Sequence, residues 1–256
     1  MIKFFRKIRQ NLLSEGKTGK YLKYAIGEII LVVIGILIAL GINNWNTNKI
    51  NTSKQRDYLS NIKSDLEKQI PILNRLKERT DSTIFVGNKI LTDYHSNQDF
   101  SLITNLNQKM TQFFYTVKFP DISSTFNELN STGQISLIKN KSLRTEIISY
   151  YQNSKDSQED IRFVTSHIVY SHIYQSLKSS TVVLAENFGL KNDIVEIPNK
   201  IHSTLTTKLT DSDTSFELYN AINFRIISAN ANRRVLLASI NEAEQLLDKI
   251  ENELKK

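Results

Sequence analysis

The sequence predicts an all-α protein, with one N-terminal transmembrane helix followed by an extracytoplasmic bundle of long helices with coiled-coil-like seams. Three observations lead to this fold class. The 256 residues include only eight glycines and three prolines, too few for a turn-rich β-sandwich or a glycine-punctuated α/β enzyme. Residues 24–42 are almost uninterruptedly apolar. Beyond them, apolar residues recur with helical spacing, and no stretch of useful length alternates as a strand does.

Residues 24–42 have the length and composition of a membrane-spanning helix. The stretch reads YAIGEIILVVIGILIALGI, and at ~1.5 Å per residue it gives about 28 Å of helix, close to the ~30 Å hydrocarbon thickness of a bilayer. Its single charged residue, Glu28, lies near the cytoplasmic end, where the carboxylate can reach the interface. Tyr21, Tyr24 and Trp45 flank the stretch and are expected at the membrane interfaces.

The formal charge of +7 is concentrated before this stretch and predicts its orientation. Residues 1–24 hold seven basic residues and one acidic one, whereas residues 43–256 hold 26 basic and 24 acidic ones. The positive-inside rule therefore predicts an inner-membrane protein in which residues 1–23 are cytoplasmic, residues 24–42 span the membrane once, and residues 43–256 form a periplasmic helical bundle domain. The near balance of charge in the exported part gives little attraction for a polyphosphate, so no nucleic-acid partner is expected.

The first residues carry a pattern of their own. Ile2, Phe5, Ile8 and Leu12 recur at helical spacing, with basic residues between them. Such a basic amphipathic segment lies in the headgroup plane, so the lipid bilayer, and anionic lipid in particular, is an expected partner. Two alternatives stay open. The basic residues can act only as a topology determinant, and residues 39–41 resemble a signal-peptide cleavage site, although the apolar stretch is longer than the usual ~7–15 residues of a signal peptide.

Two segments resemble a known family. They are MIKFFRKIRQNLL with GKYLKYAIGEIILVVIGILIAL near the N-terminus, and TFNELNSTGQISLIKNKSLRTEIISYY at residues 125–151. Both are similar to an uncharacterised family of small single-pass membrane proteins of Bacteroidota, whose domain has no known function. The resemblance implies a membrane location and a helical extracytoplasmic region, and it implies no catalytic residues.

A helix is expected soon after the span. Its apolar positions are Leu59, Ile62, Leu66, Ile70, Leu73 and Leu76. Pro71 lies inside this pattern, so the helix is expected to kink there or to stop at Ile70 and restart. If it continues from the span, the helix forms a rigid stalk.

Shorter helices are expected next. Thr125 and Glu128 fit a capping box at a helix N-terminus, and Gly133 fits the C-terminal stop of the same helix. Asn140 is expected to cap the N-terminus of the helix that follows.

Two longer apolar stripes complete the expected fold. The first stripe consists of Phe163, His167, Tyr170, Tyr174, Leu177, Thr181, Leu184 and Phe188. His167 is expected in the core with a tyrosine hydroxyl as its hydrogen-bond partner, and Gly189 is expected to end the helix. The second stripe consists of Ile222, Ile226, Ala229, Arg233, Leu236, Ile240, Ala243, Leu247, Ile250 and Leu254. Its regular spacing is typical of a coiled coil or bundle seam, with Arg233 at its edge, and the seam can pair within the chain or with a second copy.

The sequence shows no motif of a known enzyme class. The absence of cysteine excludes disulfides, thiolate metal sites and cysteine nucleophiles. The sequence contains no glycine-rich phosphate loop, nucleophile elbow or His-Glu-x-x-His motif. His167 and His172 are five residues apart, about 140° around a helix, so they do not share a face as metal ligands. We therefore expect no enzymatic activity, no cofactor, and no catalytic, cofactor-binding or metal-binding residues.

Glu128, Arg144 and Tyr151 are the best candidates for contacts to a polar ligand. They lie in the second of the two family-like segments, and Arg144 could bind a carboxylate or phosphate with two parallel hydrogen bonds. A structural salt bridge between Glu128 and Arg144 explains the same residues without a ligand.

Two functions follow from this reading. The leading hypothesis is a membrane-anchored periplasmic interaction, scaffold or sensory module that works through a homo-oligomer or an envelope protein partner. The alternative is a periplasmic ligand-binding receptor or enzyme with a site between helices near Arg144, for which a sizeable pocket with convergent polar groups would be the evidence.

Overall fold

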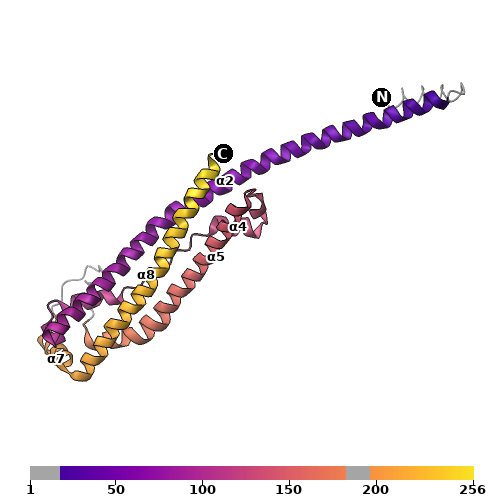
Figure 1. The fold of residues 1–256 in the computed structure, drawn as a ribbon. Coiled ribbons are helices and arrows are strands. Elements are labelled where there is room, and N and C mark those ends of the chain that lie inside the picture. Colours follow the sequence, from indigo (N-terminus) through magenta and orange to yellow (C-terminus); the bar gives the residue numbers. More distant parts are fainter. Residues whose placement is uncertain (1–17, 183–196) are drawn as a thin grey trace. The chain divides into compact units, whose positions relative to one another are not determined.

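The computed structural model describes residues 18–182 and 197–256, and all of the regular structure in them is helical (Figure 1). The elements are α2 (Thr18–Asn97), the 3₁₀-helix η1 (Phe100–Leu102), α3 (Leu106–Thr111), the 3₁₀-helix η2 (Gln112–Phe114), α4 (Ser124–Ser131), the 3₁₀-helix η3 (Gln134–Leu137), α5 (Lys141–Phe163), the π-helix η4 (Val164–Ile173), α6 (Tyr174–Ser180), α7 (Asn199–Thr210) and α8 (Ser212–Leu254). The predicted all-α class is confirmed for the described residues. The amphipathic segment predicted at the N-terminus lies outside them, as do Leu184, Phe188 and Gly189.

The chain divides into two units, residues 1–57 and residues 58–256. We call the second the helical unit. In the first unit, α2 is apolar and long enough to cross a membrane: its most apolar 18-residue window has a mean hydropathy of 2.8, and none of that window is buried. Tyr24 and Trp45 are exposed, and the ammonium of Lys49 lies 5.7 Å from the centre of the Trp45 ring. The side chain of Tyr21 lies outside what the structure describes.

The core of the helical unit lies along α2 and α8. Three clusters of buried apolar side chains follow one another, and each contains residues of both helices. Along the clusters the α2 residues run from Leu59 to Ile90, while the α8 residues run from Ile250 back to Leu218, so the two helices are antiparallel. In Figure 1, α5 runs alongside α8 in the same unit.

The two apolar faces predicted for these helices are confirmed. All six positions of the face that begins at Leu59, and all ten of the face that begins at Ile222, are buried or half-buried. Of the two expectations at Pro71, a stop at Ile70 is wrong, because α2 continues through Pro71 to Asn97. Pro71 and Glu67 are both exposed, so the carbonyl of Glu67, which loses its amide partner to the proline ring, lies on the exposed side of the helix.

The capping box predicted at Thr125 does not form. The helix begins at Ser124, with Ser123 at the N-cap position, and the Thr125 hydroxyl instead donates a hydrogen bond of 2.6 Å to Oδ2 of Asp65 on α2. The other two end signals are confirmed: Gly133 adopts φ +68° directly after α4, and the Asn140 side chain accepts from the amide of Leu143.

The stripe that begins at Phe163 is the core face of its helix only in part: Leu177 is buried and Tyr174 half-buried, but the stripe residues before them are exposed. Residues 164–173 form the π-helix η4, in which each amide bonds to the carbonyl five residues back, so a pattern spaced for an α-helix drifts off the core side. Val169 and Ile173 are buried there, whereas Phe163 and Tyr170 are exposed. The prediction of a core histidine is therefore wrong: His167 is exposed, stacks on Phe163 at 4.6 Å and lies 2.9 Å from the Ser166 hydroxyl.

Arg233 lies at the edge of the α8 face, as predicted, and its partner is a carboxylate on α2. Its Nε donates to Oδ1 of Asp81 at 2.6 Å, and Lys77 contacts the same carboxylate at 2.9 Å. Hydrogen bonds from Lys77 and Arg233 hold the pKa of Asp81 below its ordinary value. Asp81 therefore stabilises the fold above the pKa of the unfolded chain, ~3.9, and this contribution is lost as the pH falls through the lower folded pKa.

We expect Asp81→Asn to destabilise the helical unit at pH 7 by less than about 1 kcal/mol, because the ion pair is partly exposed and screened. The gap between variant and parent should close as the pH is lowered from 5 towards 2. Urea unfolding at a series of pH values measures it, with the exposed Glu78→Gln on the same helix as control. A gap that stays constant with pH would contradict the assignment.

Candidate functional site

Glu128 and Arg144 do not form the expected salt bridge in the part of the chain that the structure describes. Glu128 is exposed on α4 and accepts a hydrogen bond of 3.2 Å from the Tyr58 hydroxyl, which also lies 2.8 Å from Oε1 of Gln134. Arg144 is half-buried on the first turn of α5. Among the described residues, the ion pairs do not include the expected one between Glu128 and Arg144.

Tyr151 is a core residue. Its ring is buried and stacks on Phe126, with 4.4 Å between ring centres and 9° between ring planes. Burial, together with the nearby carboxylate of Asp65, raises the pKa of Tyr151. Its hydroxyl is buried without a hydrogen-bond partner among the described residues. None of Glu128, Arg144 and Tyr151 lines either of the two cavities described next.

A polar cavity of about 740 Å³ lies elsewhere in the helical unit. We call it the Arg225 cavity. Its walls come from α2, α3, η2, the segment after η2, and α8, through Arg79, Thr80, Ser82, Thr83, Gln108, Thr111, Gln112, Tyr115, Thr116, Val117, Arg225, Ala229 and Asn232. The described lining residues include two arginines, several hydroxyls and three amides, and no carboxylate.

Arg225 is the most unusual of these residues. Only 4% of it is exposed, and its guanidinium donates from Nε to the carbonyl of Phe113 at 3.1 Å and from Nη2 to the carbonyl of Tyr115 at 2.6 Å. Nη1 lies 3.4 Å from the Ser228 hydroxyl. These carbonyls belong to the end of η2, where a helix leaves acceptors without intrahelical donors and favours a positive charge.

No carboxylate neutralises this guanidinium within the described part of the chain, since the ion pairs formed there do not include Arg225. Loss of hydration lowers the pKa of Arg225 to about 10. The side chain therefore remains cationic at neutral pH, and a buried cation without a counter-charge at a cavity wall attracts an anion.

Asn232 lies two turns further along α8 and is also only 4% exposed. Its Oδ1 is buried and has no hydrogen-bond partner among the described residues. Thr80 and Thr83 lie across the cavity on α2 and are buried. Their hydroxyls donate hydrogen bonds to the main-chain carbonyls of Leu76 and Arg79, at 2.8 and 3.1 Å. The α2 and α8 walls thus present oxygen acceptors beside a guanidinium donor.

The sequence contains a signal for this site, although it is not a motif. Arg225, Ser228 and Asn232 are polar residues on the buried side of a helix whose neighbouring positions are apolar. Charged and amide side chains are seldom fully buried without a partner, so this interruption of the apolar face points to a polar site.

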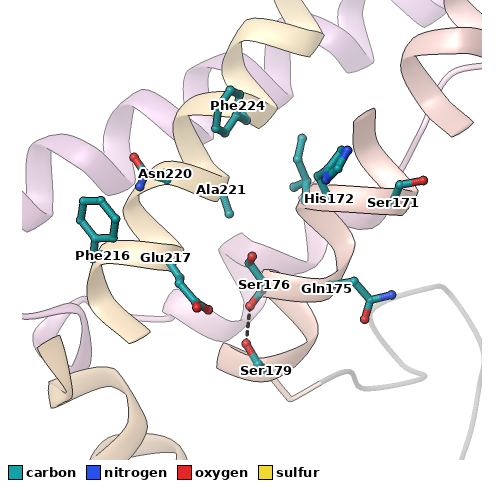
Figure 2. A pocket seen from close by; sticks show the side chains of 11 residues that line it. Ser171, His172, Gln175, Ser176, Ser179, Phe216, Glu217, Asn220, Ala221 and Phe224 are labelled. Carbon is teal, nitrogen blue, oxygen red and sulfur yellow. Dashed lines mark hydrogen bonds between the residues drawn. The ribbon is translucent and has the colours of Figure 1, made fainter. Parts of the chain in front are cut away.

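A second, more open hollow of about 600 Å³ lies between η4 and α6 on one side and α8 on the other (Figure 2). We call it the Phe224 groove. Figure 2 shows Glu217 on α8 pointing towards the helix that carries Ser176 and Ser179, with Phe216 and Phe224 on the same segment of α8. Phe216 and Phe224 are 70% and 56% exposed, an apolar rim that is typical of a surface for macromolecular contact.

Within residues 18–182 and 197–256, the grouping of side chains gives no sign of a metal centre. Among the described residues there is no group of three or more histidine, aspartate or glutamate side chains that could hold a metal ion.

Comparison with known proteins identifies a family. The model of DUF6090, described as a family of unknown function, matches residues 28–227, so the chain belongs to that family. The expectation of a domain of unknown function is thereby confirmed. No curated protein and no solved structure matches the chain.

Proposed function

We propose that this member of the DUF6090 family is a membrane-anchored sensory module, whose extracytoplasmic helical bundle binds a small anionic ligand in the Arg225 cavity. The observation that carries the proposal is the buried guanidinium of Arg225, which lines a cavity and has no carboxylate partner among the described residues. Like the ligand-binding receptor hypothesis, this function requires a site between helices, and the site proposed is at Arg225 instead of Arg144.

The apolar part of α2 supports the membrane anchor. None of its most apolar window is buried, and apolar area of that extent is unfavourable in water and favourable in lipid. Tyr24 and Trp45 lie where interface residues belong, and the basic residues before the span favour a cytoplasmic N-terminus, a single pass and a periplasmic helical unit at the inner membrane.

The chemistry of the cavity supports an anionic ligand. A guanidinium that is already held by two carbonyls is oriented before a ligand arrives, so little side-chain entropy is lost on binding. Arg79 contributes a second positive charge to the lining, and no described carboxylate there repels an anion. A volume of about 740 Å³ falls in the range of small-molecule sites, ~300–1,000 Å³.

Binding can be tested on the full chain in phosphatidylcholine nanodiscs, which present no anionic lipid. We expect millimolar succinate or inorganic phosphate to raise the melting temperature by a few degrees, since a ligand that binds only the folded state stabilises it. The matched control is Arg234→Met, an exposed arginine of the same helix, which should keep the response.

Two variants should lose the anion response, Arg225→Met because it removes the cation and Thr83→Leu because it fills part of the cavity. The second variant retains the guanidinium, so it gives a result even where the first is too unstable to melt cooperatively. An equal response of all variants would mean that the salts act on the whole surface, and the proposal would then be wrong.

The Phe224 groove favours a second candidate function, that of an interaction or scaffold module. Exposed Phe216 and Phe224 border a hollow on α8, and such rims are found where a partner protein or a second copy docks. Photo-crosslinking from position 224 in intact membranes would identify the contacting protein, whether a second copy or an envelope partner.

A further inference from the structure

Hydrogen-bond acceptors line the Arg225 cavity as well as a cation. These acceptors favour an anion that also carries a hydrogen-bond donor. Asn232 Oδ1 has no donor within the described residues. The hydroxyls of Thr80 and Thr83 donate to main-chain carbonyls, so their oxygens can act towards a ligand only as acceptors. A carboxylate or a fully ionised phosphate ester offers only acceptors, so it would pair with Arg225 and leave Oδ1 of Asn232 without a donor.

The direction of the Arg225 side chain sets the spacing between the two features. Nη1 lies 3.4 Å from the Ser228 hydroxyl, so the guanidinium extends along α8 towards Asn232. Ser228 and Asn232 are four residues apart, roughly 6 Å along the helix axis. The terminal torsion of an asparagine is broad, so its amide oxygen can turn to the cavity that the residue lines.

We infer that the ligand carries a hydroxyl or ammonium group about 5–6 Å from its anionic group, close to the axial rise from Ser228, beside which Nη1 of Arg225 lies, to Asn232. A short hydroxy acid, an amino acid with a terminal amine, or an amino-alkyl phosphate has this chemistry. The inference rests on the proposed function, since it names the ligand class of the same site.

The test compares anions that differ by one group. Butyrate, 4-hydroxybutyrate and 4-aminobutyrate form one series, and ethyl phosphate and phosphoethanolamine form the other, so the two series also separate a carboxylate from a phosphate ligand. Titration calorimetry on the full chain in phosphatidylcholine nanodiscs measures each affinity. We expect the donor-bearing member of at least one series to bind about tenfold more tightly than its parent, the effect of satisfying one buried acceptor.

The variant Asn232→Leu should remove this preference and bring the affinities within about twofold of each other. Because Oδ1 has no partner in the described structure, its loss breaks no hydrogen bond of that atom, and the variant is expected to fold. Asn230→Leu is the matched control, since Asn230 is exposed on the same helix, and it should keep the preference.

The outcomes separate the two proposals. Equal binding of parent and donor-bearing anions by the unaltered chain, or a preference that survives Asn232→Leu, would overturn the inference and leave an anion site in place. If no anion of either series binds, and neither succinate nor phosphate stabilises the protein, then the proposed function and the inference both fall.

Discussion

Replacement of Arg225 by methionine is expected to lower the free energy of unfolding of the helical unit by about 3 kcal/mol or more. The carbonyls of Phe113 and Tyr115 would lose the donors that satisfy them at 3.1 and 2.6 Å. Each buried acceptor left without a partner costs ~1–3 kcal/mol, and hydrogen bonds from a charged donor lie in the upper part of that range. The loss of a buried cation offsets part of this cost, because the desolvation of the guanidinium is also removed.

Urea unfolding of the full chain, followed by circular dichroism, measures this change. Arg234→Met should shift the midpoint little, since Arg234 is exposed on the same helix. Arg225→Lys should fall between the two, because an ammonium keeps the charge and cannot reproduce the planar pair of contacts from Nε and Nη2. A loss below about 1 kcal/mol for Arg225→Met would show that water replaces the guanidinium at both carbonyls.

Arg225 also shows why the helical pattern alone does not give the contacts of the site, although polar residues on a buried face mark its place. The regular apolar spacing from Ile222 to Leu254 predicts a continuous buried face, and the structure confirms it. The two carbonyls that position Arg225 belong to residues more than a hundred positions earlier, and no local rule connects them to α8. Periodicity predicts which face of a helix is buried. A polar site depends in addition on which distant backbone segment packs against the polar residues of that face.

The elements that sequence reasoning predicted correctly are those that local chemistry decides. Asn140 caps α5 and Gly133 follows the end of α4, because each of these residues suits the backbone position that it occupies. Thr125 was misassigned because its hydroxyl has a stronger partner in Asp65 on another helix. The first half of the stripe that begins at Phe163 was mispredicted for a different reason, because a π-helix changes the angular step on which the prediction depends.

The apolar stretch of α2 is the other feature that local composition decides, and its membrane insertion is open to a strong test. Replacing both Val33 and Ile34 by lysine puts two charges near the centre of residues 24–42. Each charge at the centre of a spanning helix costs ~2.5–3.5 kcal/mol on the insertion scale, so the pair costs about 6 kcal/mol. We expect the parent chain to resist extraction from membranes by alkaline carbonate and the double variant to be extracted.

Asn46→Lys is the control for this test, because it adds a charge beyond the apolar stretch and should leave the chain in the membrane. The mass of the parent chain recovered from membranes separates an anchor from a signal peptide, since cleavage near residues 39–41 would remove everything before them. Retention of the double lysine variant after carbonate treatment, or recovery of a shortened parent chain in the soluble fraction, would contradict a membrane anchor in α2. An intact, carbonate-resistant parent chain together with an extractable double variant would assign the anchoring to residues 24–42, because the apolar stretch is the part of α2 that the two lysines change.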